Sequence, residues 1–451
     1  MKNMTVGNPL KLILMFAVPI LMSNLFQQLY NMSDTIMIGR MLGVKSLAAL
    51  GATFPVFFLI LFIVMSFTAG LTVITAQYFG RKDYDTMRKS VATSIILSLI
   101  LSIISTILMI LFLPFMLNIT NVPAELFDLT YSYLIIMCGF SFVMMMFNLL
   151  QAFLRAVGNS KGPFYFLVLS CLTNIFFNYV FIKYVGLGIA GSAYGTIVAV
   201  AISSIASIVY MYKKYSILKP NKEDWKFSWG FAKEHLKIAI PMCMQGLLIS
   251  LSIFIFQRGC NEFGAEAIAA VAAANRIDNL GGNVLFSLGM ALTTFVAQNY
   301  GCNRIARIRR GVNQVCIVSI LVSIVLGVLI IIFKEDILSW FISDEELKAF
   351  PQVAIWAKQY LNVTACSYFF LGSIHLYRNA LQGLGNGWMP LLSSIIELGF
   401  RMFAVFVLTN YVGFYGIILS NPLAWIGGAA VLWIGYYFEI KKLGTTVRLK
   451  L

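Results

Sequence analysis

Residues 90–114 read SVATSIILSLILSIISTILMILFLP, a stretch of 25 positions without a charged side chain. A helix of about 20 apolar residues crosses the hydrocarbon core of a bilayer, so this stretch is long enough to span a membrane. It does not alternate apolar and polar residues, as a strand of a transmembrane barrel would. An open sheet edge cannot face lipid, which leaves the helix. The stretch therefore predicts a transmembrane helix.

Stretches of this kind recur along the whole chain of 451 residues. Twelve are expected to be helices: 10–33, 47–76, 90–114, 130–154, 162–184, 188–211, 236–257, 267–298, 312–333, 353–380, 388–410 and 413–438. In the chain 60% of the residues are hydrophobic and only 11% are charged, whereas soluble domains average about 25% charged residues. A water-soluble protein is excluded, and the sequence predicts an all-α integral membrane protein with twelve transmembrane helices.

The longest polar stretch, which carries seven lysines, lies between the sixth and the seventh run. We therefore expect two halves joined by a linker. The predicted parts are an N-lobe (1–211), a cytoplasmic linker (212–236), a C-lobe (237–440) and a cytoplasmic tail (441–451).

Short motifs repeat between the halves. The motif AQYFG at residues 76–80 is answered by AQNYG at residues 297–301, 221 positions later. Arg88-Lys89 and Arg309-Arg310 have the same spacing. Because each half contains an even number of spans, both insert the same way up. We expect two six-helix bundles related by a pseudo-two-fold axis along the membrane normal, which is the architecture of a transporter that works by alternating access.

The formal net charge of +15 is explained by topology. If the N-terminus is cytoplasmic, 23 of the 33 Lys and Arg residues lie in cytoplasmic segments and six in outer ones. Such a bias indicates that both termini and the linker face the cytoplasm of a cell membrane. A nucleic-acid partner is not needed to account for the basic residues.

Residues 27–40 read QQLYNMSDTIMIGR and resemble the first-helix motif of the multidrug and toxic compound extrusion (MATE) transporters. Further matches are residues 77–80, 150–159, 173–178, 188–193, 269–275 and 381–386. The resemblance covers essentially the whole chain. It implies a secondary active antiporter that exports amphipathic, often cationic organic compounds in exchange for H⁺ or Na⁺.

Asp34 is the first candidate for the coupling group. It lies in an apolar helix, and a charge in low dielectric is costly, so this carboxyl group can take up a proton or pair with a cation. The alternative is that Asp34 ends the first span at the interface, near Arg40. The resemblance favours coupling, since the family's N-lobe acid stands at this motif position.

The resemblance also implies that Asn174, Asn178 and Thr196 line the coupling site with Asp34. One branch of the family has a second acid where this chain has Asn178, and its loss favours H⁺ over Na⁺. A pocket rich in oxygen atoms would still accept sodium. The alternative role of the two asparagines is hydrogen bonding between helices.

Two further groups of residues are candidates. The substrate cavity is predicted to be lined by polar and aromatic residues: Gln27, Tyr30, Asn31, Gln151, Gln245 and Gln257. A C-lobe network is predicted from charged and titratable residues: Arg276, Asp278, His375, Glu397 and Arg401. Glu397 and Arg401 are four residues apart on a helix, so we expect them to neutralise each other. A role of that pair in gating or as a C-lobe ligand site, or a proton relay through His375, stays open.

The alternatives to a multidrug exporter are less well supported. A lipid-linked precursor flippase of the same superfamily would need several bases in its cavity, and few bases fall within the spans. An enzyme is not expected, because the sequence contains neither an HExxH motif nor a P-loop. The seven cysteines are scattered and predict no metal framework. We expect a monomer in the bilayer without a cofactor, which binds small organic molecules and H⁺ or Na⁺.

Overall fold

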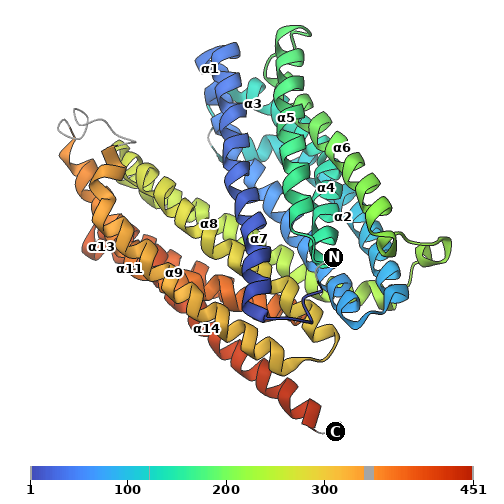
Figure 1. Cartoon of the computed structure of the whole chain (residues 1–451). Helices are drawn as coiled ribbons and strands as arrows, with labels where there is room; N and C mark the ends of the chain where they lie inside the picture. The colour runs from blue at the N-terminus through green and yellow to red at the C-terminus, as the bar shows by residue number, and fades with distance from the viewer. Residues whose placement is uncertain (1–2, 121, 340–349, 449–451) are drawn as a thin grey trace. The chain divides into compact units, whose positions relative to one another are not determined.

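The computed structural model describes residues 3–120, 122–339 and 350–448, and these residues form helices and no β-strand (Figure 1). Lys2, Lys348 and Lys450, which enter the charge pattern above, lie outside the described residues. The first half contains α1 (Pro9–Arg81), α2 (Tyr84–Ile119), α3 (Ala124–Gly139), α4 (Ser141–Ala156), α5 (Lys161–Lys183), α6 (Gly188–Lys214), η1 (Ser216–Leu218) and η2 (Lys222–Trp225). The second half contains α7 (Trp229–Glu262), α8 (Ala265–Gly301), α9 (Ile305–Ser339), α11 (Pro351–Gly383), α12 (Trp388–Phe403), η3 (Ala404–Leu408), α13 (Thr409–Val412) and α14 (Tyr415–Arg448).

The long helix α1 contains both of the first two predicted spans. The sequence predicts a break between residues 33 and 47, but the helical backbone is interrupted only at Gly43, with φ 81° and ψ −178°. A positive φ of this size is accessible to glycine without steric cost. Because the helix continues past residue 33, Asp34 lies inside α1 rather than in a connection.

One other predicted span is broken. The span expected at 130–154 consists of α3 and α4, which are bent by 52° at a break of a single residue, Phe140. This break lies within apolar sequence, where hydropathy alone gives no sign of a bend. The span expected at 388–410 is continuous over Trp388–Val412, although it changes from α12 through a π-helical turn (η3) to α13.

The prediction of twelve transmembrane helices is confirmed. Within the described residues, nine helices are each long and apolar enough to cross a membrane, and the bent pair α3–α4 makes a tenth. Helix α1 is 73 residues long and contains two of the predicted spans, although it counts as one helix. Helix α11 is also long enough at 33 residues, although His375 and Arg378 reduce its mean hydropathy.

The last residues of the predicted linker form the first turns of helix α7. The linker was expected to extend to residue 236, but α7 already begins at Trp229. One side of these turns is buried, since Ala232 and His235 are fully covered. The His235 ring bonds to the Ser90 hydroxyl of α2 over 2.8 Å. Two of the lysines that suggested a linker, Lys233 and Lys237, therefore lie on the exposed side of a packed helix.

The chain forms two compact units. Unit 1 comprises Met1–Asn3 and Val18–Gly246, and unit 2 comprises Met4–Ala17 and Leu247–Leu451. Helices α1 and α7 therefore contribute to both units. The division into an N-lobe ending at residue 211 and a C-lobe beginning at residue 237 stays a proposal.

Candidate functional site

The Asp34 carboxylate is buried in unit 1, where its side chain is 9% exposed. It accepts hydrogen bonds from Asn178 Nδ2 on α5, at 2.5 Å, and from Ser192 Oγ on α6, at 2.9 Å. Both bonds end on Oδ1. The second oxygen, Oδ2, can therefore take up a proton while both bonds persist.

The two asparagines of α5 connect Asp34 to α6. Asn174 and Asn178 lie one helical turn apart and exchange amide hydrogen bonds of 3.3 and 3.4 Å. Asn174 Nδ2 also donates to Thr196 Oγ1 at 3.0 Å. The four predicted coupling residues thus form one hydrogen-bonded group across three helices, and all four are at least nine-tenths buried.

Two glycines allow α6 to approach α5 this closely. A Cβ atom on Gly195 would lie 2.0 Å from Asn178 Oδ1 and 2.9 Å from the Asn178 main-chain nitrogen. A Cβ atom on Gly191 would lie 3.1 Å from the Phe181 main-chain carbon. Small residues at a helix interface let backbones come together and bring polar side chains into contact. Gly195 therefore determines where the Asn178 amide can sit.

Two tyrosines complete the surroundings of Asp34. The Tyr30 hydroxyl is buried on α1 without a hydrogen bond to the described residues and interacts electrostatically with the Asp34 carboxylate. Tyr133 on α3 is 5% exposed and interacts electrostatically with Asp34 and Tyr30. Among the described residues, no Lys or Arg forms an ion pair with Asp34. The negative charge of the ionised form therefore has only neutral partners.

Sequence reasoning did not identify Ser192 and Tyr133 as site residues. Ser192 lies within residues 188–193, one of the segments that resemble the family. A hydroxyl group among the small residues of this segment could have indicated a site residue. Tyr133 follows the polar residues Thr130, Tyr131 and Ser132 at the start of an apolar run, a pattern that does not by itself indicate a site. Only the bent α3–α4 pair brings Tyr133 toward α1.

The residues predicted for the substrate cavity occupy different environments. Gln27 donates to Asn31 on the same turn of α1, at 3.2 Å. Gln151 is 5% exposed and donates to Ser207 of α6, at 3.1 Å. Gln245 is equally buried, on α7. Gln257 is exposed and donates to Asn261. Tyr30 alone in this group joins the Asp34 site, and a cavity role for the others stays a prediction.

Glu397 and Arg401, which were expected to neutralise each other, interact electrostatically but form no ion pair among the described residues. Glu397 on α12 accepts from Arg378 Nη2 of α11 at 2.5 Å and from Ser393 Oγ at 2.8 Å. Arg401 instead donates to Asn421 on α14, at 2.8 Å. Spacing within a helix could not show that α11 supplies a nearer guanidinium group.

A second group of hydrogen-bonded polar side chains lies in unit 2. Asn421 Nδ2 donates to the Tyr360 hydroxyl at 2.8 Å, and that hydroxyl donates to Asn275 Oδ1 at 2.9 Å. The Asp278 carboxyl group lies beside the hydroxyls of Tyr360 and Tyr368 on α11. These groups connect α8, α11, α12 and α14, and they include one acid, Asp278, and one base, Arg401.

The remaining predicted residues of unit 2 do not form one cluster. Arg276 is exposed on α8. The His375 ring packs edge-on against Phe286, with ring centroids 5.6 Å apart. Within residues 3–120, 122–339 and 350–448, no group of three or more His, Cys, Asp or Glu side chains is arranged to hold a metal ion.

Comparison with known proteins matches the chain along most of its length. The model of a family described as MatE matches residues 19–180 and 241–407. The Probable multidrug resistance protein YoeA of Bacillus subtilis is 26% identical over 439 residues, which cover 95% of this chain and 93% of that protein. The Multidrug export protein MepA of Staphylococcus haemolyticus is 23% identical over 92% of this chain and 90% of its own length.

Solved structures show the same fold. A transporter of the MOP superfamily from Pyrococcus furiosus superimposes with a TM-score of 0.89 at 21% identity, over 98% of both chains. An outward-facing multidrug resistance MATE family transporter superimposes with a TM-score of 0.87 at 21% identity, over 99% of both chains. The likeness extends from the first helix to the last.

Proposed function

The chain belongs to the MatE family of membrane transporters, and from this premise we propose that it exports amphipathic, often cationic organic compounds in exchange for protons. Membership makes it a multi-pass membrane transporter and not an enzyme. Multidrug resistance and export are the named activities of YoeA and MepA. The lipid-linked precursor flippase is not favoured by any of these relatives.

The observation that carries the proposal is the set of partners of Asp34. A buried ionised carboxylate is costly unless a positive charge offsets it. In unit 1 its hydrogen-bond donors are an amide and a hydroxyl, which are both neutral. The ionised form therefore attracts either a proton or a cationic compound. Because both would neutralise the same carboxylate, the binding of one opposes the binding of the other.

The orientation of the amides favours H⁺ over Na⁺. A sodium ion needs several oxygen ligands at once, as hard cations do. Asn178 presents its Nδ2 to Asp34, and its oxygen accepts from Asn174. Thr196 Oγ1 is likewise occupied as an acceptor. A proton needs only the free oxygen of Asp34.

The transport cycle follows from this competition. A proton from outside displaces the bound compound from Asp34, and release of the proton to the cytoplasm restores the charge that binds the next compound. The site must then open to one side of the membrane at a time, as in other secondary transporters built from repeats. We propose that the termini and the polar segment before α7 face the cytoplasm, and that one chain is sufficient for transport.

The decisive experiment is dye efflux from proteoliposomes in which each ion gradient is imposed alone. For the wild type, we expect a proton gradient without sodium to drive ethidium movement. Asp34→Asn should abolish that movement, whereas Asp128→Asn, which removes an exposed carboxylate from α3, should leave it unchanged. Efflux driven by a sodium gradient alone would overturn the choice of H⁺. Proton-driven efflux by Asp34→Asn at the wild-type rate would overturn the role of Asp34.

A further inference from the structure

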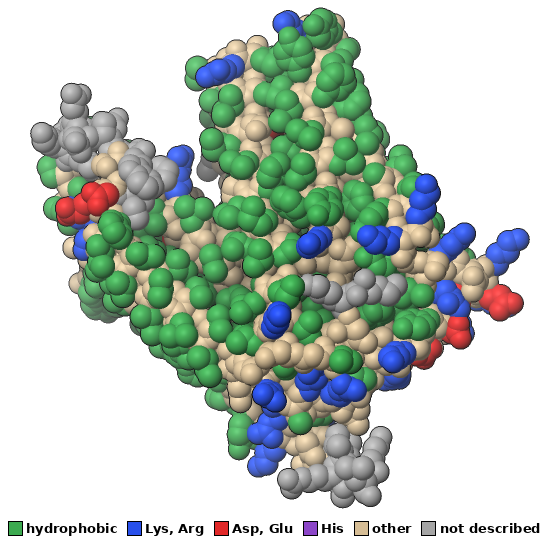
Figure 2. Space-filling model, in the orientation of Figure 1, with side chains coloured by type: hydrophobic (Ala, Val, Ile, Leu, Met, Phe, Trp, Pro, Cys, Tyr) green, Lys and Arg blue, Asp and Glu red, His purple; other side chains and the backbone are tan. Residues whose placement is uncertain are grey.

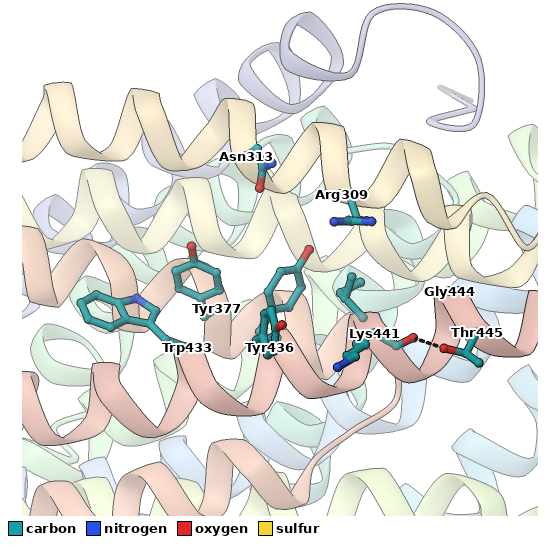
Figure 3. A pocket seen from close by; sticks show the side chains of 10 residues that line it. Arg309, Asn313, Tyr377, Trp433, Tyr436, Lys441, Gly444 and Thr445 are labelled. Atoms are coloured by element: carbon teal, nitrogen blue, oxygen red, sulfur yellow. Dashed lines mark hydrogen bonds between the residues drawn. The ribbon is translucent and has the colours of Figure 1, made fainter.

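A pocket of about 600 Å³ lies within unit 2, between α9, α11 and α14. Its polar lining comes from Arg309 and Asn313 of α9, Tyr377 of α11, and Tyr436 and Lys441 of α14. Figure 3 shows Arg309 opposite Tyr436 and Lys441, with Trp433 farther along α14. None of these residues belongs to the polar groups around Asp34 or Glu397.

The charges in this pocket have no internal counterpart. Among the described residues, neither Arg309 nor Lys441 forms an ion pair. The acid nearest in sequence on α14, Glu439, is bonded to Asn386 at 3.1 Å. A pocket that holds two cations and no carboxylate favours an anionic ligand.

A buried hydroxyl in the same pocket also has no partner. Tyr436 is 8% exposed, and its hydroxyl oxygen is buried without a hydrogen bond to the described residues. Such a group costs free energy unless a ligand or water satisfies it. The hydroxyl interacts electrostatically with Arg309, so an anion held by Arg309 would lie where Tyr436 can donate to it.

The pocket lies near the ends of its helices. Arg309 is in the first turns of α9, which begins at Ile305, and Tyr377 is in the last turns of α11, which ends at Gly383. Figure 2 shows Lys and Arg side chains gathered near the C-terminal end of α14, next to a surface that is mostly hydrophobic. Basic residues beside tyrosine and tryptophan mark the head-group level of a bilayer.

An apolar surface continues from the pocket along α14. Ile434, Tyr437 and Phe438 are about 60% exposed, at 58%, 62% and 60%. Tyr437 also lines the pocket. A ligand that fills both places needs an anionic head and an apolar tail. This combination distinguishes a phospholipid from a soluble phosphate compound.

We propose that this pocket binds the anionic head group of a membrane phospholipid. Its phosphate is held by Arg309 and Lys441 and accepts a hydrogen bond from Tyr436. Its acyl chains lie against the exposed apolar residues of α14. Basic pockets between transmembrane helices bind anionic head groups in this way. In the orientation proposed above, the lipid belongs to the cytoplasmic leaflet, but the binding itself does not depend on that orientation or on the export function.

The test is lipid retention by the intact purified protein, measured by native mass spectrometry after equilibration with phosphatidylglycerol or phosphatidylcholine. The wild type should retain phosphatidylglycerol in preference. The double variant Arg309→Gln/Lys441→Gln should bind it about 30-fold more weakly, from the usual contribution of two basic residues near a membrane surface. The control Arg310→Gln/Lys442→Gln removes the same charge from adjacent exposed positions outside the lining, and should behave as the wild type.

Two further measurements separate the possible ligands. Tyr436→Phe removes only the hydroxyl and should weaken phosphatidylglycerol binding several-fold without loss of protein. Glycerol 3-phosphate, which has the head group but no tail, should not displace the lipid at millimolar concentration. Equal losses in the two double variants would overturn the site, and so would equal retention of phosphatidylcholine. Displacement by glycerol 3-phosphate would overturn the choice of a lipid.

Discussion

Asp34 in unit 1 and Glu397 in unit 2 are two carboxylates with almost the same geometry and different partners. Each accepts a serine hydroxyl, at 2.9 Å from Ser192 and at 2.8 Å from Ser393. Each accepts a second bond of 2.5 Å on the same oxygen. For Asp34 the second donor is the neutral amide of Asn178, whereas for Glu397 it is the guanidinium of Arg378.

That single difference separates a carboxylate that can exchange a cation from one that is already neutralised. A guanidinium group stays charged, so a carboxylate paired with it has little to gain from a proton. A carboxylate held by neutral donors keeps its hydrogen bonds in either state and gains from binding a positive charge. We therefore infer that the polar contacts of Glu397 hold helices together, while those of Asp34 position a group that exchanges its ligand.

The largest expected effect tests whether the ion pair of Glu397 stabilises the fold. Arg378→Gln removes the positive partner of Glu397, whose side chain is 14% exposed. Breaking a buried ion pair on one side costs about 3–5 kcal/mol, because the remaining charge is unpaired. We expect a marked fall in the thermal unfolding temperature in detergent, measured by size-exclusion chromatography after heating.

The matched control is the double variant Arg378→Gln/Glu397→Gln, which removes both charges. It should recover most of the lost stability and should keep proton-driven efflux. If Glu397→Gln abolished proton coupling as Asp34→Asn is expected to do, the contrast between the two carboxylates would be wrong.

A second prediction tests the positioning of the Asn178 amide. Gly195→Ala places a Cβ atom 2.0 Å from Asn178 Oδ1, so the amide must move away from Asp34. Loss of buried hydrogen bonds costs about 1–3 kcal/mol, and we expect proton-driven efflux to fall by about tenfold. Dye efflux at equal protein levels measures this effect.

Gly51→Ala is the control for that variant. Gly51 lies on α1, and a Cβ atom there would meet nothing within 4 Å. The variant should transport as the wild type does. Normal efflux by Gly195→Ala would show that the position of the Asn178 amide does not matter for coupling.

The comparison also shows what a sequence can and cannot reveal. The number of spans and the burial of Asp34 follow from hydropathy, because a 25-residue apolar stretch has few alternatives to a transmembrane helix. The grouping of Asp34 with Asn174, Asn178 and Thr196 came from a resemblance and not from spacing. It agrees with the hydrogen bonds between α1, α5 and α6.

Contacts between different helices were beyond that reasoning. The pairing of Glu397 with Arg378 depends on how α11 packs against α12, and the spacing of Glu397 and Arg401 pointed to a different bond. The buried start of α7 was hidden by its lysines, since a charge count does not show which side of a helix is covered. Side-chain periodicity defines a face, but only the fold shows what lies against it.

The smallest effect concerns a third carboxylate, which lies outside the spans. Asp83 precedes α2, and its side chain accepts a hydrogen bond from the Thr86 main-chain nitrogen at 3.1 Å. This backbone bond is the main reason why the pKa of Asp83 lies below its usual value. A lowered pKa means that the ionised form stabilises the folded protein at neutral pH. That contribution is lost as the pH falls through the folded-state pKa, below about pH 4.

We expect Asp83→Ala to lower the stability by about 0.5–1 kcal/mol at pH 7, a small value because water screens the charge. The difference from the wild type should shrink toward pH 3, as unfolding followed by tryptophan fluorescence would show. Asp83→Asn keeps an acceptor without the charge, so its stability relative to Asp83→Ala should not depend on pH. A deficit of Asp83→Ala that is equal at pH 7 and pH 3 would mean that the cap acts without its charge. The negative charge of Asp83, which also lies near Arg81 and Lys89, would then contribute nothing measurable to stability.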